Sequence, residues 1–372
     1  MSTFSCPVIR IEKFADNPNS DSLCVINGPQ GPLQFKKGEL KIGDLACFIP
    51  ADSLVPVARP EFAFLAKDAD KDGYARIRGI RLRKIPSVGL LLRCPDVIAI
   101  PGKDAQGEPR STFVPIRPGD DLQHWYGVKK YEPPQTHSFH TDSTQAAGPK
   151  DILRSPTYDV ENLWQFEGAV IENSSELALD YVCRWSLTEK IHGCNFRCYT
   201  DNEGIVHIGS RNRWVNSGNV WHEAYEKYKH LLDPLMQQNP GTIFFGEVFG
   251  KVQDLTYSVD GVDLRLFDSF NTKTNRYNAI GELGRMLLGV PNALSLLVPQ
   301  VSQVSGNLRY ALEEAKKVCS GVSLIDGKTM REGVVVRPVS TEVMVFGKDP
   351  MRLMTKVVSP EYLSRLNGTE EH

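Results

Sequence analysis

The residue best placed to do chemistry is Lys190, which follows an apolar segment and directly precedes a turn. Residues 181–188 are predicted to form a strand. A turn is predicted just after it, because His192, Gly193 and Asn195 include residue types typical of turns. A strand that ends in this way places the lysine amine at the junction between the strand and the following loop. Because a neutral lysine amine is a strong nucleophile, covalent catalysis is one reaction type open to this stretch. A lone lysine beside a turn is more often an ordinary surface residue, so the rest of the chain must decide.

The sequence Glu-Lys-Ile-His-Gly-Cys-Asn at 189–195 resembles the nucleotidyl-lysine motif of the covalent nucleotidyltransferases. Its form is similar to that of the ATP-dependent RNA ligases that seal nicks in double-stranded RNA. The resemblance implies that Lys190 attacks the α-phosphate of ATP, because a lysyl-AMP phosphoramidate keeps AMP transferable. It also implies that Glu189 or its backbone reads the adenine edge. His192 and Asn195, beyond the nucleophile, would then help the later steps.

Five further motifs that resemble this family follow in the expected order. They are Ser210-Arg211-Asn212, Phe245-Gly246-Glu247-Val248-Phe249-Gly250, Phe267-Asp268, Glu332-Gly333-Val334-Val335-Val336-Arg337 and Met354-Thr355-Lys356-Val357. The resemblance implies that Arg211 handles phosphates at the strand ends, that Glu247 lies near the ribose and that Phe267 stacks on adenine. Glu332, with Glu247 as a second candidate, would hold Mg²⁺ or Mn²⁺, and Lys356 would contact the α-phosphate. Each motif alone is weak, but five in order argue against coincidence.

Two positions depart from the family pattern. Met354 replaces the first lysine of a common Lys-x-Lys pair, so phosphate contact would rest on Lys356, with Arg352 as a second candidate. His192 stands where most relatives have Asp, which favours the RNA-joining branch over DNA ligases and capping enzymes. Lys190 must lose a proton before it attacks, and positive charge from Lys356, Arg211 or a metal ion would favour the neutral amine.

The composition is that of an ordinary globular protein. Of 372 residues, 41% are hydrophobic and 24% charged, and the formal net charge is −2. Because the chain has no net positive charge, any nucleic-acid binding must depend on a local cluster of basic residues. The eight cysteines show no zinc-site spacing, which favours reduced thiols. Neither a signal peptide nor a membrane-spanning segment is visible. We therefore expect a cytoplasmic protein that needs no membrane, and we expect a monomer.

Residues 1–126 are expected to form a small all-β barrel of the OB type that binds nucleic acid. Short apolar runs at 8–14, 22–26, 44–49, 75–83 and 89–94 alternate with turn residues. The string 16–23 also resembles the start of OB domains that bind tRNA or precede certain RNA ligases. Residues 127–157, rich in Pro and polar residues, are expected to be a linker or mobile loop.

Four arginines lie close together in the fourth candidate strand. Arg76 and Arg78 share one face, and a bulge at Gly79 would bring Arg81 and Arg83 onto that same face. This strand is the strongest candidate for contact with RNA phosphates, and Arg211 is a further RNA-binding candidate by resemblance. A solvated strand face is the alternative interpretation.

Residues 158–366 are expected to form an α+β adenylation domain, followed by a tail at 367–372. Amphipathic helices are predicted at 219–232, 279–288 and 307–318. Strands are predicted at 181–188, 196–199, 242–249, 264–270 and 333–338. These elements do not form regular βαβ repeats.

The resemblance implies an ATP-dependent RNA ligase that acts in RNA repair. It would join 3′-hydroxyl and 5′-phosphate RNA ends through lysyl-AMP and 5′-adenylated RNA. One alternative is a non-catalytic RNA-binding protein with a decayed ligase fold, which the presence of Lys190, Glu247, Glu332 and Lys356 argues against. The other is a capping-type or DNA-ligase-type nucleotidyltransferase. Those families continue into a further OB domain, whereas only residues 359–372 follow the last motif here.

Overall fold

In the computed structural model, the chain divides into two compact units. Residues 2–134 and 360–372 form one unit, and residues 135–359 form the other. The structure describes residues 4–103, 109–131, 145–152, 156–163, 182–340, 344–345 and 351–365. Residues 132–144 and 153–155 of the expected linker, and the tail expected at 367–372, therefore lie outside the described residues.

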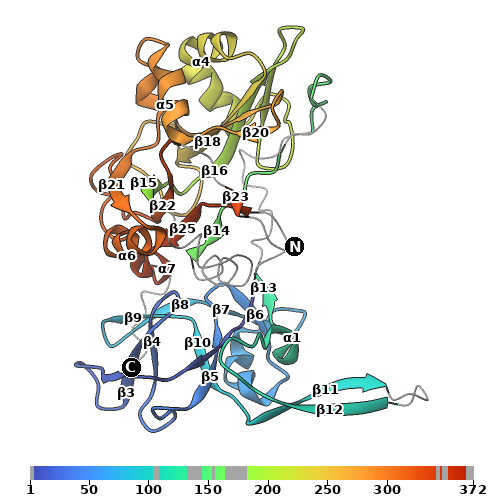
Figure 1. Ribbon diagram of the computed structural model, residues 1–372, viewed down its shortest axis with the longest axis vertical. Coiled ribbons are helices and arrows are strands. Elements are labelled where there is room, and N and C mark those ends of the chain that lie inside the picture. Colours follow the sequence, from blue (N-terminus) through green and yellow to red (C-terminus); the bar gives the residue numbers. More distant parts are fainter. Residues whose placement is uncertain are drawn as a thin grey trace. The chain divides into compact units, whose positions relative to one another are not determined.

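The first unit is built from short antiparallel strands, as expected for an OB-type barrel (Figure 1). Its elements are β1 (Val8–Arg10), β2 (Ala15–Asp16), β3 (Leu23–Gly28), β4 (Gly31–Lys36), β5 (Leu45–Ile49), β6 (Ser53–Pro56), η1 (Pro60–Asp68), β7 (Tyr74–Ile77), β8 (Gly79–Leu82), β9 (Ile85–Val88), β10 (Leu90–Arg93), β11 (Val97–Lys103), β12 (Pro109–Pro115), α1 (Gln123–Tyr126), β13 (Lys129–Lys130) and α7 (Pro360–Leu363). Alternating residues of the strands fill one apolar core, in which Phe62 and Tyr126 meet edge to face.

The strand predicted at 75–83 is divided into two. β7 pairs with β6, whereas β8 pairs with β9, and the change of partner occurs at Arg78. At Gly79 a Cβ atom would lie 2.5 Å from the carbonyl oxygen of Leu363 in α7. Gly79 is thus required by close backbone approach, and the last described turn of the chain packs on the first unit rather than on the second.

The second unit contains two five-stranded sheets (Figure 1). One has the order β14 (Glu161–Asn162), β25 (Thr355–Val358), β22 (Gly333–Pro338), β15 (Cys183–Lys190) and β21 (Gln300–Gly306). The other has the order β17 (Val206–Gly209), β16 (Cys194–Thr200), β18 (Thr242–Gly250), β19 (Val262–Asn271) and β20 (Arg276–Tyr277). A separate hairpin joins β23 (Met344–Val345) to β24 (Met351–Arg352).

The helices cover these sheets and supply their apolar cores. α4 (Val220–Gln238), α5 (Ile280–Leu288) and η2 (Ala293–Leu296) pack on the sheet that contains β18, and α6 (Leu308–Val318) packs on β21 and β22. Asn219 and Asn307 cap α4 and α6 by accepting hydrogen bonds from backbone N–H groups in the first turn. The three helices predicted from periodicity are therefore present, and the sequence already contained the start signals of two. None of the helices in the described ranges has the length and apolar character of a membrane span.

Candidate active site

Strand register places Lys190 beside Glu332. Lys190 is the last residue of β15, and it pairs with Gly333, the first residue of β22. Glu332 directly precedes Gly333, so the two side chains meet at one edge of the sheet. Lys190 Nζ lies 2.6 Å from Glu332 Oε1, in an ion pair whose side chains are 24% and 10% exposed. Two motifs more than a hundred residues apart are thereby joined by backbone pairing.

Glu247 enters the same site from the second sheet. It pairs across strands with Asn195, whose Nδ2 donates to Glu247 Oε2 at 3.1 Å. Gly193 makes this approach possible, because a Cβ atom there would lie 2.2 Å from the carbonyl oxygen of Val248. The turn after Lys190 therefore presses directly on β18, as only glycine allows.

The two carboxyl groups differ in their charge state. Burial raises the pKa of Glu247 to about 8, and the neighbouring Glu332 adds to this rise while Lys190 opposes it. Burial acts on Glu332 as well, but contact with Lys190 and His192 outweighs it and lowers the pKa of Glu332 to about 2. At neutral pH Glu332 is therefore ionised and Glu247 is mostly protonated.

These carboxyl groups fit a divalent cation. Glu332 Oε2 and Asn195 Oδ1 are buried and have no hydrogen-bond partner among the described residues. A nearby positive charge would also offset the burial that keeps Glu247 protonated. No cluster of three or more His, Cys, Asp or Glu with metal-binding geometry occurs in the described part of the chain. Mg²⁺ needs no such cage, because it usually keeps waters and binds through one or two carboxylates and substrate phosphates.

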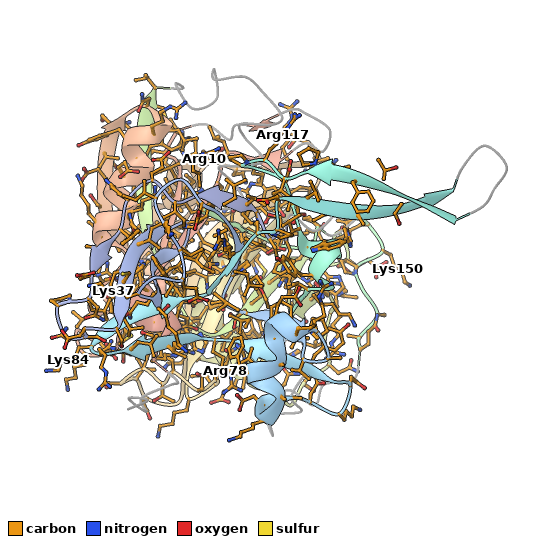
Figure 2. The ribbon with its side chains drawn as sticks, turned by 90° about the horizontal axis from the view of Figure 1, so that it is seen from below. Arg10, Lys37, Arg78, Lys84, Arg117 and Lys150 are labelled. Carbon is orange, nitrogen blue, oxygen red and sulfur yellow. The ribbon has the colours of Figure 1, made fainter. Side chains whose placement is uncertain are left out.

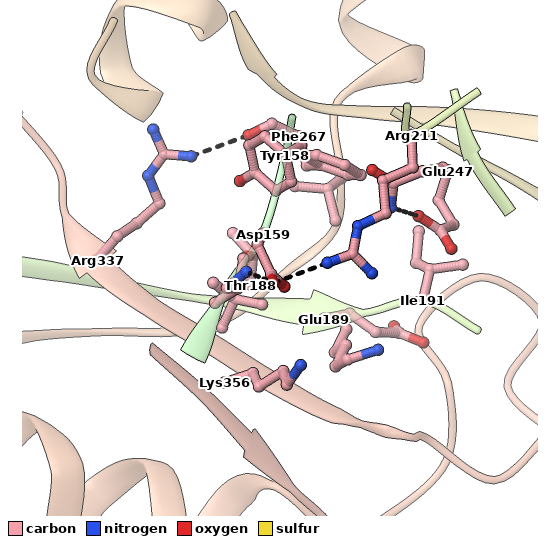
Figure 3. Close-up of a pocket in the computed structure, with 15 residues that line it drawn as sticks. Tyr158, Asp159, Thr188, Glu189, Ile191, Arg211, Glu247, Phe267, Arg337 and Lys356 are labelled. Atoms are coloured by element: carbon pink, nitrogen blue, oxygen red, sulfur yellow. Dashed lines mark hydrogen bonds and ion pairs between the residues drawn. The ribbon is translucent and has the colours of Figure 1, made fainter. Parts of the chain in front are cut away.

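A cavity of about 180 Å³ extends from Lys190 to an aromatic wall (Figure 3). Phe267 on β19 lines this wall, and its ring centroid lies 4.8 Å from that of Tyr158. Such a pair can stack on a flat aromatic ligand. Tyr158 could not be recognised as a site residue from the sequence, because a single aromatic residue beside a linker forms no periodic pattern.

A buried network fixes the position of Phe267. Asp268 is fully buried and accepts hydrogen bonds from the Tyr158 hydroxyl at 2.9 Å, Arg337 at 3.1 Å and Arg352 at 2.9 Å. Burial alone would raise the pKa of Asp268, but Arg337 and Arg352 outweigh it and lower the pKa. Arg337 also donates to the carbonyl oxygen of Phe267 at 3.0 Å. Arg352 is thus bound to Asp268, and of the two cations proposed for phosphate contact near residues 354–357, Lys356 is the one that lines the cavity.

The remaining candidate residues lie around the cavity. Lys356, Glu189 and Arg211 all line it, and Arg211 forms an ion pair with Asp159 at 2.7 Å (Figure 3). The carboxylate of Glu189 points elsewhere, since its Oε2 accepts from the backbone N–H of Leu324 at 2.8 Å. Burial raises the pKa of Glu189, although hydrogen bonds oppose the rise.

His192 lies at the Lys190 end of the site. Its Nε2 is 2.9 Å from Asp254 Oδ1, and its Nδ1 is 3.6 Å from Glu332 Oε2. Asp254 and its neighbours Gln253 and Tyr257, in the connection between β18 and β19, were not identified from the sequence. That connection resembles an ordinary polar loop, and only the fold brings it to the turn.

The four strand arginines predicted to bind RNA lie in the first unit, and Arg76 differs from the other three in being half-buried. Arg76 forms an ion pair with Asp52 at 2.6 Å, and its guanidinium lies 3.7 Å from the ring centroid of Tyr131. Arg78, Arg81 and Arg83 are exposed. In Figure 2, Arg78 lies near the middle of the lower edge and Lys84, which is also exposed, lies toward the left end.

Comparison with known proteins agrees with this architecture. The RNA ligase family model matches residues 184–358, and an OB-fold domain model matches residues 6–94. A search of the curated proteins finds no match.

Several solved structures of a Naegleria gruberi RNA ligase have a similar fold. An apo mutant is 21% identical, with a TM-score of 0.66 and coverage of 98% of both chains. A mutant solved with ATP and Mn is 20% identical, with a TM-score of 0.66 and coverage of 97% of this chain and 98% of that one. A mutant solved with AMP and Mn is 22% identical, with a TM-score of 0.65 and coverage of 96% and 97%.

The family matches and the fold therefore lead to one assignment. The chain carries a domain of the RNA ligase family, preceded by an OB-fold domain.

Proposed function

We propose that this protein is an ATP-dependent RNA ligase that joins a 3′-hydroxyl to a 5′-phosphate and acts in RNA repair. The observation that carries the proposal is the placement of Lys190 beside Glu332, at the end of a cavity whose far wall is Phe267 and Tyr158. Lys190, Glu247 and the aromatic wall line the cavity, and Glu332 lies against Lys190 at its end. These groups are the parts that attack on a nucleotide phosphate requires.

ATP would lie with its adenine against Phe267 and its phosphates toward Lys190. The backbone of Glu189, rather than its carboxylate, would read the adenine edge, because the carboxylate binds Leu324. Lys356 and Arg211, which line the cavity, would contact the phosphates. The Asp268 network would hold the aromatic wall in place before the nucleotide arrives.

The reaction would then proceed in three steps. The Lys190 amine, after losing its proton, would attack the α-phosphorus of ATP and displace pyrophosphate. The RNA 5′-phosphate would then take AMP from the lysine, and the RNA 3′-hydroxyl would displace AMP to form the new phosphodiester. A divalent cation held by Glu332 and Glu247 would neutralise charge on the phosphate oxygens. His192 and Asn195 follow the nucleophile in the turn, where they would help the second and third steps.

The first unit would hold the RNA. Arg83 and Lys84 form the two-residue loop of the β8–β9 hairpin, and both have positive φ, at 47° and 71°. Asn and Gly are the residues that fit such a loop best, so two long basic side chains at these positions cost stability. Because basic side chains occupy these unfavourable backbone positions, a functional role is indicated for them. We propose that Arg83 and Lys84, with the exposed Arg78 and Arg81, contact RNA phosphates, and that Arg76 serves the fold instead.

The proposal is tested by a sealing assay on the full chain. A nicked RNA duplex with a labelled 5′-phosphate should become one longer strand in the presence of ATP and Mg²⁺. Lys190→Ala should leave the nick open, yet it should seal a strand that already carries 5′-AMP, because attack of the 3′-hydroxyl on the adenylated strand needs no lysyl-AMP. Sealing of DNA alone, or nucleotide transfer from GTP alone, would support one of the other nucleotidyltransferase classes. Binding of RNA without any transfer would support a decayed ligase.

A further inference from the structure

An acidic side chain, Asp159, faces one of the cations proposed to contact phosphate. Asp159 and Arg211 both line the cavity, and Arg211 Nη2 lies 2.7 Å from Asp159 Oδ2 (Figure 3). The other carboxylate oxygen, Oδ1, accepts a hydrogen bond from the backbone N–H of Val160 at 2.9 Å. A negative charge at a cavity proposed to hold ATP opposes phosphate binding, so the presence of Asp159 needs an explanation.

The fold, and not the ion pair, fixes the backbone that carries Asp159. On one side, Tyr158 is buried and its hydroxyl donates to Asp268 at 2.9 Å. On the other side, the carbonyl oxygen of Glu161 accepts from Thr355 Oγ1 at 2.9 Å, and β14 pairs with β25 from this residue onward. Asp159 lies between these two anchors, so its carboxylate stays at the cavity whether or not it contacts Arg211.

Arg211 is also carried by a fixed turn, directly after β17. The backbone N–H of Ser210 donates to the carbonyl oxygen of Arg213 at 2.9 Å and closes this turn. The side chain of Arg211 is 49% exposed, and that of Asp159 is 53% exposed. The pair can therefore open by rotation of the side chains alone, without a change in either backbone.

An ion pair this exposed is weak enough for a phosphate group to replace it. Exposed pairs shift an equilibrium by about 5-fold or less, because water screens the charges. A terminal phosphate monoester carries about −1.5 to −2 charge at neutral pH, more than a carboxylate, and offers three acceptor oxygens. Arginine binds carboxylate and phosphate through the same guanidinium N–H groups, so the two anions compete for Arg211.

We propose that the Asp159 carboxylate stands in for a substrate phosphate. It holds Arg211 at the cavity before substrate binds, and the terminal phosphate of the substrate then displaces it from Arg211. This inference rests on the proposed function, which makes Arg211 a phosphate contact. Both ATP and the 5′ end of RNA carry a terminal phosphate, and binding measurements distinguish these two sources.

Asp159→Asn removes the charge and keeps the shape of the side chain. The amide oxygen can still accept from Val160, so the local backbone should be preserved. Glu203→Gln is the matched control, because it removes a charge from an exposed position between β16 and β17. Among the described residues, no ion pair joins Glu203 to Arg211, whose partner is Asp159. Calorimetric unfolding midpoints should change little in either variant, since exposed charges contribute little to stability.

The first measurement is fluorescence anisotropy of the full chain with an RNA strand labelled at its 3′ end, without divalent metal. The Kd is measured for a strand with a 5′-phosphate and for the same strand with a 5′-hydroxyl, and the ratio gives the preference for the terminal phosphate. Asp159→Asn should increase this preference by about 2- to 5-fold, the range for loss of an exposed ion pair. Glu203→Gln should leave the preference unchanged, and Asp159→Asn should have no effect in an Arg211→Ala background.

The second measurement compares ATP with adenosine in the same variants, by titration calorimetry without divalent metal. A preference that increases only for the RNA strand would identify the RNA 5′-phosphate as the group that displaces Asp159. A preference that increases only for ATP would identify the phosphates of the nucleotide instead.

The proposal is overturned if Asp159→Asn lowers both preferences or leaves both unchanged, since Asp159 would then orient Arg211 or take no part in binding. It is also overturned if Glu203→Gln gives the same increase, or if the increase persists in the Arg211→Ala background. An increase of the expected size in a chain that forms no lysyl-AMP and seals no RNA would support the role of Asp159 and contradict the ligase function. Sealing by a chain whose preferences do not change would contradict only the role of Asp159.

Discussion

Replacing Glu247 by Gln should make the nucleotide-free protein more stable and less active. Glu247 is buried, and its pKa is raised from 4.5 to about 8. Gln is a neutral group of the same shape as the protonated acid, and its oxygen can still accept from Asn195. The substitution therefore removes an unfavourable ionisation while it removes a candidate metal ligand.

The sign and size of the effect follow from linkage. The unfolded chain ionises Glu247 near pH 4.5 and the folded chain near pH 8, so stability is fully present below pH 4.5 and is lost as the pH rises to about 8. At about 1.36 kcal/mol per pKa unit, the loss is ~5 kcal/mol at most. Glu247→Gln should avoid this loss, so its advantage should be near zero at pH 4 and a few kcal/mol at pH 8.5.

Calorimetric unfolding of both proteins between pH 4 and pH 9, without nucleotide or metal, measures this difference. For a domain of this size about 2–4 °C per kcal/mol is expected, so the unfolding midpoint should rise by roughly 5–15 °C at pH 8.5. Added Mg²⁺ should narrow the gap by stabilising only the protein that has the carboxylate. The reasoning would be refuted if the difference in unfolding midpoint were the same at pH 4 and pH 8.5, or if the mutant were less stable at every pH. Either result would show that Glu247 is not a buried, mostly protonated carboxyl group.

Three other predictions concern the aromatic wall, His192 and the basic surface. Phe267→Leu should raise the KM for ATP less than Phe267→Ala, because Leu keeps the bulk without the π face; equal KM values would argue against stacking. His192→Ala should still form lysyl-AMP but fail to seal a pre-adenylated strand, and normal sealing would make it only a turn residue. Charge reversal at three exposed arginines should weaken sealing and reduce its dependence on salt concentration without affecting adenylation. If the mutant and the natural chain show the same sealing rate at every salt concentration, the first unit does not bind RNA through these arginines. The three are Arg78, Arg81 and Arg83.

Much of the fold could be predicted from local patterns. Apolar periodicity predicted α4, α5 and α6. The structure shows in addition that Asn219 and Asn307 cap two of them. Five strands of the second unit, β15, β16, β18, β19 and β22, lie close to the predicted ranges, and β18 and β22 are mainly apolar in sequence. The division of the strand at Arg78 could not be predicted, since it depends on α7 at the far end of the chain, which packs against Gly79.

The site was predictable where short motifs carry it and not where tertiary packing assembles it. Lys190, Glu247 and Glu332, each taken from a different motif, lie close together in the structure. Tyr158 and Asp254 have no sequence pattern of their own, because each becomes part of the site only when distant strands and loops meet. Asp268 and Arg337 lie in motifs that were identified, but the motifs do not reveal that the two side chains bind each other. Arg76 was predicted with its neighbours from strand alternation alone, and its ion pair with Asp52 depends on a contact that alternation does not reveal.

The most direct test of the account is covalent labelling of the full chain with α-labelled ATP and Mg²⁺, followed by denaturing electrophoresis and mass analysis of the labelled peptide. The account predicts an acid-labile AMP adduct on Lys190, no adduct in Lys190→Ala, and much weaker labelling from GTP. Persistent labelling of Lys190→Ala, or AMP on any other residue, would contradict it.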